Sequence, residues 1–123
     1  MSEIKTFKSL LVANRGEIAA RIIKTSNYMG LNTIAVYTDA DAMSPHVSMA
    51  NEAINIGTGP IGDSYLSIEK IIDVAKKVGA DAIHPGYGFL SENHNFSEAC
   101  NSSGIVFIGP SPKSIELMGN KAQ

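Results

Sequence analysis

The 123-residue chain has the length expected of one globular domain, spanning residues 1–123. Hydrophobic residues make up 44% of it and charged residues 18%, which suits a buried core and argues against disorder. The net charge of −2 argues against a nucleic-acid-binding surface, and no apolar run approaches the roughly 20 residues that cross a bilayer. The single cysteine, Cys100, cannot form an internal disulfide, so we expect a soluble protein of a reducing compartment.

Short apolar runs alternate along the chain with segments of helical apolar spacing. In chain order, we expect a strand at 10–13, a helix at 17–29 ending before Gly30, a strand at 33–37, a polar loop at 38–44, a short helix from Pro45 to Ala50, a strand at 53–56, a glycine-rich loop at 57–62, a helix at 68–78 capped by Ser67, a strand at 80–84, a helix at 92–103, a strand at 105–108 and a last helix from Pro112 to about Gly119. The 68–78 helix has the clearest apolar stripe.

This alternation predicts a Rossmann-like, three-layer α/β fold with a mostly parallel sheet and helices on both faces. Ligands of such sheets bind outside the carboxyl ends of the strands. The segments that should carry function are therefore those that follow strands, at 14–17, 37–41, 57–62, 85–92 and 109–111.

The turn from His84 to Asn93 is the densest in unusual residues. Gly86 and Gly88 permit positive φ and a close backbone approach, and free N–H groups there suit an anion or a polar ring. Tyr87 should then stand at the carboxyl edge of the sheet. The alternative is a tight loop in which Phe89 and Leu90 only seal the core.

The first turn after a strand, at 14–17, has one glycine where a dinucleotide fingerprint needs three. It is either a packed strand-to-helix turn or a polar cluster of Asn14, Arg15 and Glu17. Asp39 and Asp41 follow the second strand, where a ribose-binding acid can lie, although a solvated loop is the commoner explanation.

The remaining candidate groups point to structural roles. His84, before a proline, is expected to be a satisfied strand-end residue, and no second ligand at metal spacing accompanies it. His46 and His94 are expected at the surface or as capping residues, and Cys100 is expected to be buried and inert. The residues alone thus indicate part of a ligand site without a complete catalytic set.

Four segments, at 11–23, 82–93, 107–111 and 118–121, resemble the biotin carboxylase family in sequence, order and spacing. They include Ala13-Asn14-Arg15-Gly16-Glu17, His84-Pro85-Gly86-Tyr87-Gly88-Phe89 and Met118-Gly119-Asn120-Lys121. The resemblance implies the N-terminal domain of the biotin carboxylase part of a biotin-dependent carboxylase. The stretch 44–50 looks more like the acyl-CoA carboxylase alpha chains. Asn120 and Asn51 depart from the family's usual Asp, and we interpret both as tolerated drift.

The family's reaction uses ATP to phosphorylate bicarbonate and passes the carboxyl group to N1′ of biotin, with Mg²⁺ neutralising the phosphates. By resemblance, Lys121 contacts the ATP phosphates, Tyr87 and Gly88 form one wall of the biotin pocket, and Arg21 and Phe89 lie at a homodimer interface. No catalytic residue and no metal ligand is expected in 1–123. The metal ligands and the bicarbonate clamp belong to an ATP-grasp domain and a C-terminal domain expected after Gln123, so the isolated chain should be inactive.

The resemblance also implies a carrier domain or subunit bearing the biotin, a carboxyltransferase subunit, and a cytoplasmic or mitochondrial-matrix location. Two alternatives come from other classes. One is a free-standing nucleotide-binding α/β module, and the other is the N-terminal domain of a different ATP-grasp ligase.

Overall fold

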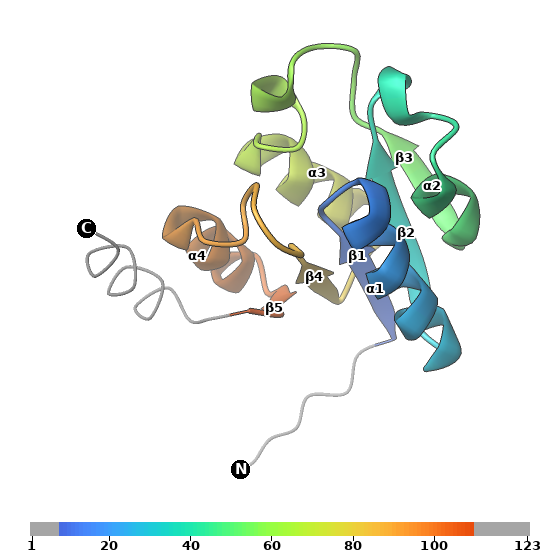
Figure 1. The fold of residues 1–123 in the computed structure, drawn as a ribbon. Helices are drawn as coiled ribbons and strands as arrows, with labels where there is room; N and C mark the ends of the chain where they lie inside the picture. Colours follow the sequence, from blue (N-terminus) through green and yellow to red (C-terminus); the bar gives the residue numbers. More distant parts are fainter. Residues whose placement is uncertain (1–7, 110–123) are drawn as a thin grey trace.

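A computed structural model describes residues 8–109, which form an open parallel sheet with helices on both faces (Figure 1). The strands are β1 (Ser9–Val12), β2 (Asn32–Tyr37), β3 (Glu52–Asn55), β4 (Ala82–His84) and β5 (Val106–Phe107). The helices are α1 (Gly16–Tyr28), α2 (Pro45–Met49), α3 (Ile68–Val78) and α4 (His94–Ser102), with 3-10 turns at Asp39–Asp41 and Ile61–Asp63. The predicted fold class is confirmed.

The sheet has the order β3-β2-β1-β4-β5, and every pairing is parallel. β1 is central: Leu11 lies opposite Ile34 of β2 on one side and Ile83 of β4 on the other. The first three strands extend the sheet in one direction and the last two in the other. The order therefore reverses between β1 and β4, which is where open α/β sheets bind ligands.

Alternate residues of β1 pack against different layers. Leu11 and Ala13 belong to the larger apolar cluster with α3 and α4, whereas Leu10 and Val12 pack on the opposite face with α1. Figure 1 shows α1 and α2 on one side of the sheet and α3 and α4 on the other. Because both faces are covered, the middle of each central strand is apolar on both sides, as at Leu10–Val12 of β1 and Ile34–Val36 of β2.

Local signals fix the helix ends. Ser67 accepts a hydrogen bond from the Lys70 N–H at the start of α3, and Gly79 ends that helix at φ 71°, as the sequence predicts. α4 begins at His94 rather than Glu92, because the Asn93 side chain accepts from the Phe96 N–H and caps the helix there. The helix predicted from Pro112 lies outside the described residues.

Cys100 is fully buried on α4, as predicted. Burial raises the pKa of its thiol to about 12, so the reactive thiolate is scarce at neutral pH. In the part of the chain that the structure describes, no helix is long and apolar enough to cross a membrane.

Candidate functional site

The loops that follow β1 and β4 meet where the strand order reverses. The Ala13 N–H donates to the His84 carbonyl at 2.9 Å and continues the ladder past the end of β1. Beyond this point the two segments diverge, since β1 leads into α1 and β4 leads into the turn at 85–91. The two segments with the densest motifs in the sequence are therefore neighbours in space.

Asn14 joins these two loops through its side-chain amide. Its Nδ2 donates to the Pro85 carbonyl at 2.7 Å and to the Tyr87 carbonyl at 2.8 Å. Its Oδ1 accepts from the Arg15 N–H at 2.8 Å, and the residue is only 1% exposed. Both amide donors are thus used on the turn, and the position of its backbone is fixed from β1.

The turn itself depends on left-handed backbone conformations. Gly86 and Gly88 have φ of 68° and 72°, and Phe89 has φ of 49°, an unusual value for a residue with a side chain. The Gly86 N–H donates to His84 Nδ1 at 3.0 Å, and burial lowers the pKa of that histidine. The outcome is a closely held turn with the Tyr87 side chain 76% exposed at its tip.

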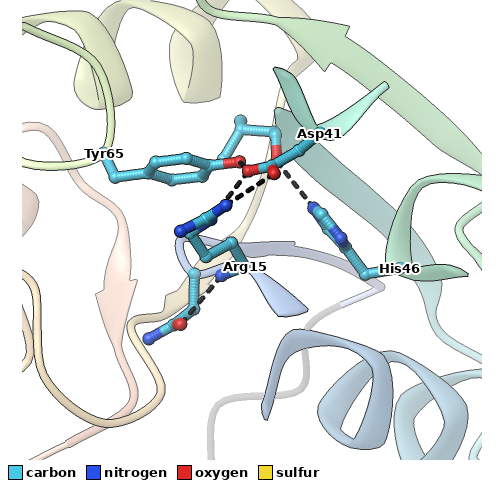
Figure 2. Close-up of polar contacts among 6 residues, drawn as sticks. Arg15, Asp41, His46 and Tyr65 are labelled. Atoms are coloured by element: carbon cyan, nitrogen blue, oxygen red, sulfur yellow. Dashed lines mark hydrogen bonds and ion pairs between the residues drawn. The ribbon is translucent and has the colours of Figure 1, made fainter. Parts of the chain in front are cut away.

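A second polar group lies beside this turn and consists of Arg15, Asp41 and Tyr65 (Figure 2). Arg15 donates from Nε to Asp41 Oδ2 at 2.7 Å and from Nη2 to Oδ1 at 2.6 Å, a bidentate ion pair. The Tyr65 hydroxyl donates to Asp41 Oδ2 at 2.7 Å. Hydrogen bonds from Arg15 hold the pKa of Asp41 below its ordinary value, and burial raises the pKa of Tyr65 to about 12.

His46 lies next to this group and is completely buried, which corrects the predicted surface or capping role. Its Nε2 donates to the Val36 carbonyl at 3.1 Å (Figure 2). Its Nδ1 has no hydrogen-bond partner among residues 8–109. Burial lowers the pKa of His46, so the ring is neutral at physiological pH.

The model of the biotin carboxylase N-terminal domain family matches residues 6–115. The chain belongs to this family. It is 56% identical over 117 residues to biotin carboxylase 2 of Bacillus subtilis, covering 95% of this chain and 26% of that protein. It is 51% identical over 115 residues to the propionyl-CoA carboxylase alpha chain of Ruegeria pomeroyi, covering 94% of this chain and 17% of that one.

Solved structures of relatives agree with the fold. The biotin carboxylase domain of a thermophilic 2-oxoglutarate carboxylase, bound to bicarbonate, matches with a TM-score of 0.91 and 53% identity, over 96% of this chain and 26% of that one. A dimer of the corresponding Hydrogenobacter thermophilus domain, in complex with MgADP, ADP and bicarbonate, matches with a TM-score of 0.89 and 52% identity, over 94% and 25% of the two chains. The chain spans about a quarter or less of the curated relatives it matches.

The biotin carboxylase residues expected from the sequence fall in different places. Tyr87 and Gly88 lie together at the tip of the 85–91 turn, and both are exposed. Arg21 is exposed on α1, where it lines, with His84 and Tyr87, a groove of about 490 Å³. Phe89 is not beside Arg21, because its half-buried ring packs with the α3 and α4 cluster. Lys121 and Asn120 lie outside the described residues.

Sequence reasoning missed the polar group around Asp41. The 38–44 segment is polar and was expected as a solvated loop, but Asp41 is 6% exposed and paired with Arg15. Of the cluster suggested for 14–17, Arg15 joins this group and Asn14 bonds the 85–91 turn, whereas Glu17 is exposed. Tyr65 had no motif around it, so its only signal was an aromatic residue next to a glycine-rich loop.

No cluster of three or more metal-ligating side chains is present within residues 8–109. The described part of the site can hold a ligand by shape, by backbone groups and by the Tyr87 ring.

Gly86→Ala should destabilise this chain more than Gly104→Ala. Both glycines have positive φ, but a Cβ at Gly104 meets nothing within 4 Å, whereas at Gly86 it would lie 2.6 Å from Asn14 Nδ2. Asn14 cannot move aside without losing its two bonds to the turn. We expect the Gly86 variant to lose at least ~1 kcal/mol more in urea unfolding, the usual cost of overpacking. Equal losses would show that Asn14 does not fix the turn.

Stability should fall as the pH is lowered from about 7 to about 5. The folded-state pKa of His46 lies below its ordinary value of 6.5, so only the unfolded chain takes up the proton in this range. The contribution of neutral His46 to the free energy of unfolding is therefore fully present above pH 6.5. It is lost as the pH falls toward the folded-state pKa, by up to ~1.4 kcal/mol per pH unit for one histidine. His84 contributes with the same sign. In urea titrations, His46→Gln and His84→Gln should each flatten the dependence, and the double variant most. An unchanged slope in His46→Gln would contradict the assignment.

Proposed function

We propose that this chain acts as the N-terminal domain of a longer biotin carboxylase and forms one wall of its biotin site. One observation carries the proposal: the family's turn is held rigidly by Asn14 and presents Tyr87 at the point where the strand order reverses. That is the position at which an open α/β sheet binds a ligand. The match of the biotin carboxylase model favours this family over other ATP-grasp ligases.

The turn fits a small polar ring such as that of biotin. The Tyr87 side chain is 76% exposed, and a Cβ on Gly88 would meet no atom within 4 Å, so the space beside the turn is open. An aromatic ring can pack on an apolar ring face, and backbone groups of a glycine turn can approach closely. The proposed role of this chain is then to bind and orient, and residues 8–109 hold no cluster of side chains that could ligate a metal ion.

The chemistry is supplied by ATP, Mg²⁺ and bicarbonate, which together carboxylate biotin. MgADP and bicarbonate are named with the Hydrogenobacter thermophilus relative, which supports the same substrates here. We assign the ATP-phosphate contact in this chain to Lys121, and the metal and bicarbonate ligands to ATP-grasp and C-terminal domains. The isolated 1–123 chain, as a single domain, should therefore not turn over ATP.

The proposed partners are a biotin carboxyl carrier domain, a carboxyltransferase subunit and a second copy of the enzyme. Arg21 is exposed and lines a groove, which supports a contact there, and the Hydrogenobacter thermophilus relative is described as a dimer. Phe89 remains a proposed contact of the same interface. Relatives include a mitochondrial methylcrotonoyl-CoA carboxylase alpha subunit from Dictyostelium discoideum. This relative supports an acyl-CoA as the proposed acceptor, and the proposed location is the cytoplasm or the mitochondrial matrix.

A domain exchange tests the function directly. This chain would replace the matching residues of Bacillus subtilis biotin carboxylase 2, to which it is 56% identical. We expect biotin-dependent ADP release from the chimera and none from the same enzyme with the domain deleted. A folded chimera that releases no more ADP than the deletion would contradict the proposed function.

Tyr87→Ala, in the active chimera, should raise the KM for biotin by about tenfold, the change for an interaction of ~1.4 kcal/mol. The KM for ATP and the melting temperature should hardly change, because the side chain is exposed. Tyr87→Phe keeps the ring and should behave like the parent. Met43→Ala is the matched control, since Met43 is 95% exposed on another loop. A raised KM for ATP beside an unchanged KM for biotin would place Tyr87 elsewhere.

A further inference from the structure

The four loops that follow β1 to β4 are connected by one side chain each. Arg15 follows β1, Asp41 follows β2, Tyr65 follows β3 and Phe89 follows β4. Arg15 and Asp41 form the bidentate pair, and Tyr65 donates to the same carboxylate (Figure 2). The Tyr65 ring then lies 5.5 Å from the Phe89 ring, measured between centroids.

These contacts close into a ring around the carboxyl edge of the sheet. Phe89 is two residues from Tyr87, whose carbonyl accepts from Asn14, and Asn14 precedes Arg15. The turn at 85–91 is thus held from two directions, by Asn14 on the β1 side and by Tyr65 on the β3 side. We name this set, Asn14, Arg15, Asp41, Tyr65 and Phe89, the edge ring.

Phe89 needs the second support. Its φ of 49° is in the left-handed region, which residues with a Cβ adopt only where the surroundings enforce it. Its ring packs on Tyr65, which is 1% exposed and cannot move without disturbing the core. The hydroxyl of Tyr65 is in turn fixed by Asp41, so the carboxylate controls where the Phe89 ring can sit.

We infer that Asp41 is a positioning residue for the biotin-side turn and acts through Tyr65 and Phe89 on Tyr87 and Gly88. The inference rests on the proposed function. The ion pair is open to solvent on one side, with the Arg15 side chain 41% exposed and the Asp41 side chain 8% exposed, and a pair in contact with water contributes little to the free energy of unfolding. The pair is well suited to fixing the orientation of a side chain, because the planar Arg15 guanidinium and the Tyr65 hydroxyl together allow the Asp41 carboxylate only one orientation.

The experiment compares Asp41→Asn with the parent in the intact carboxylase that carries this chain. The substitution keeps the shape but removes the charge that Arg15 and Tyr65 share. We expect kcat/KM for free biotin to fall roughly ten- to hundredfold, the effect of displacing a binding group by about 1 Å. The KM for ATP should stay within about twofold, because the expected change is confined to the biotin side. A variant that only folded less well would lose activity with neither KM changed. Asp73→Asn is the matched control, because Asp73 is exposed on α3.

Two further variants separate positioning from folding. Tyr65→Phe keeps the ring on Phe89 and deletes only the bond to Asp41, so it should show a smaller change in the same direction. The double variant Asp41→Asn, Tyr65→Phe should show less than the sum of the two losses, because both break one contact. Hydrogen exchange of the amides at 86–90 should speed up in Asp41→Asn, with no matching change in α3.

The outcomes are distinct. If the parent carboxylase lacks biotin-dependent activity, the proposed function fails and the inference falls with it. If the parent is active but Asp41→Asn folds with an unchanged kcat/KM for biotin, or alters both KM values alike, only the inference is overturned. Should Asp41→Asn not fold, Tyr65→Phe decides: an unchanged kcat/KM for biotin and unchanged exchange at 86–90 would overturn the positioning role.

Discussion

The arrangement of the site depends on the side-chain amide of Asn14. A buried amide must satisfy its donors, and here both are used on carbonyls of the turn that follows β4. These two hydrogen bonds hold Gly86 so close to the Asn14 amide that a Cβ at position 86 would have no room. They also aim Tyr87 outward at the point where the strand order reverses. A polar residue at the end of a central strand thus fixes the conformation of the turn that follows the neighbouring strand.

The buried charge at Asp41 serves the same edge in another way. Three hydrogen bonds converge on its carboxylate, from two nitrogens of Arg15 and the hydroxyl of Tyr65. Arg15 follows β1, Tyr65 follows β3 and Asp41 itself follows β2, so three loops that a Rossmann-like sheet leaves independent are joined at one carboxylate. The neighbouring His46 stays neutral because burial lowers its pKa, and it adds no positive charge to compete with Arg15.

The fold was predictable from local patterns, and the polar group was not. The apolar stripe of α3 and its Ser67 cap act within a few residues, so the sequence determines them directly. The burial of Asp41 depends on Arg15, 26 residues earlier, and on Tyr65, 24 residues later. The polar composition of 38–44 predicts a solvent-exposed loop unless these distant partners are known. The turn at 84–93 was recognised because its glycines need special backbone angles, and these are visible in the sequence.

The relatives suggest why the structure concentrates its constraints on this edge. Their names include carboxylases of propionyl-CoA, methylcrotonoyl-CoA and 2-oxoglutarate, yet this chain is 51–57% identical to members of each kind. A domain so similar across relatives named for different acceptors suits the proposed role at a biotin site, which does not depend on the acceptor. A rigid turn is favoured for that role, because a ligand that must be presented in one orientation gains from a wall that does not move.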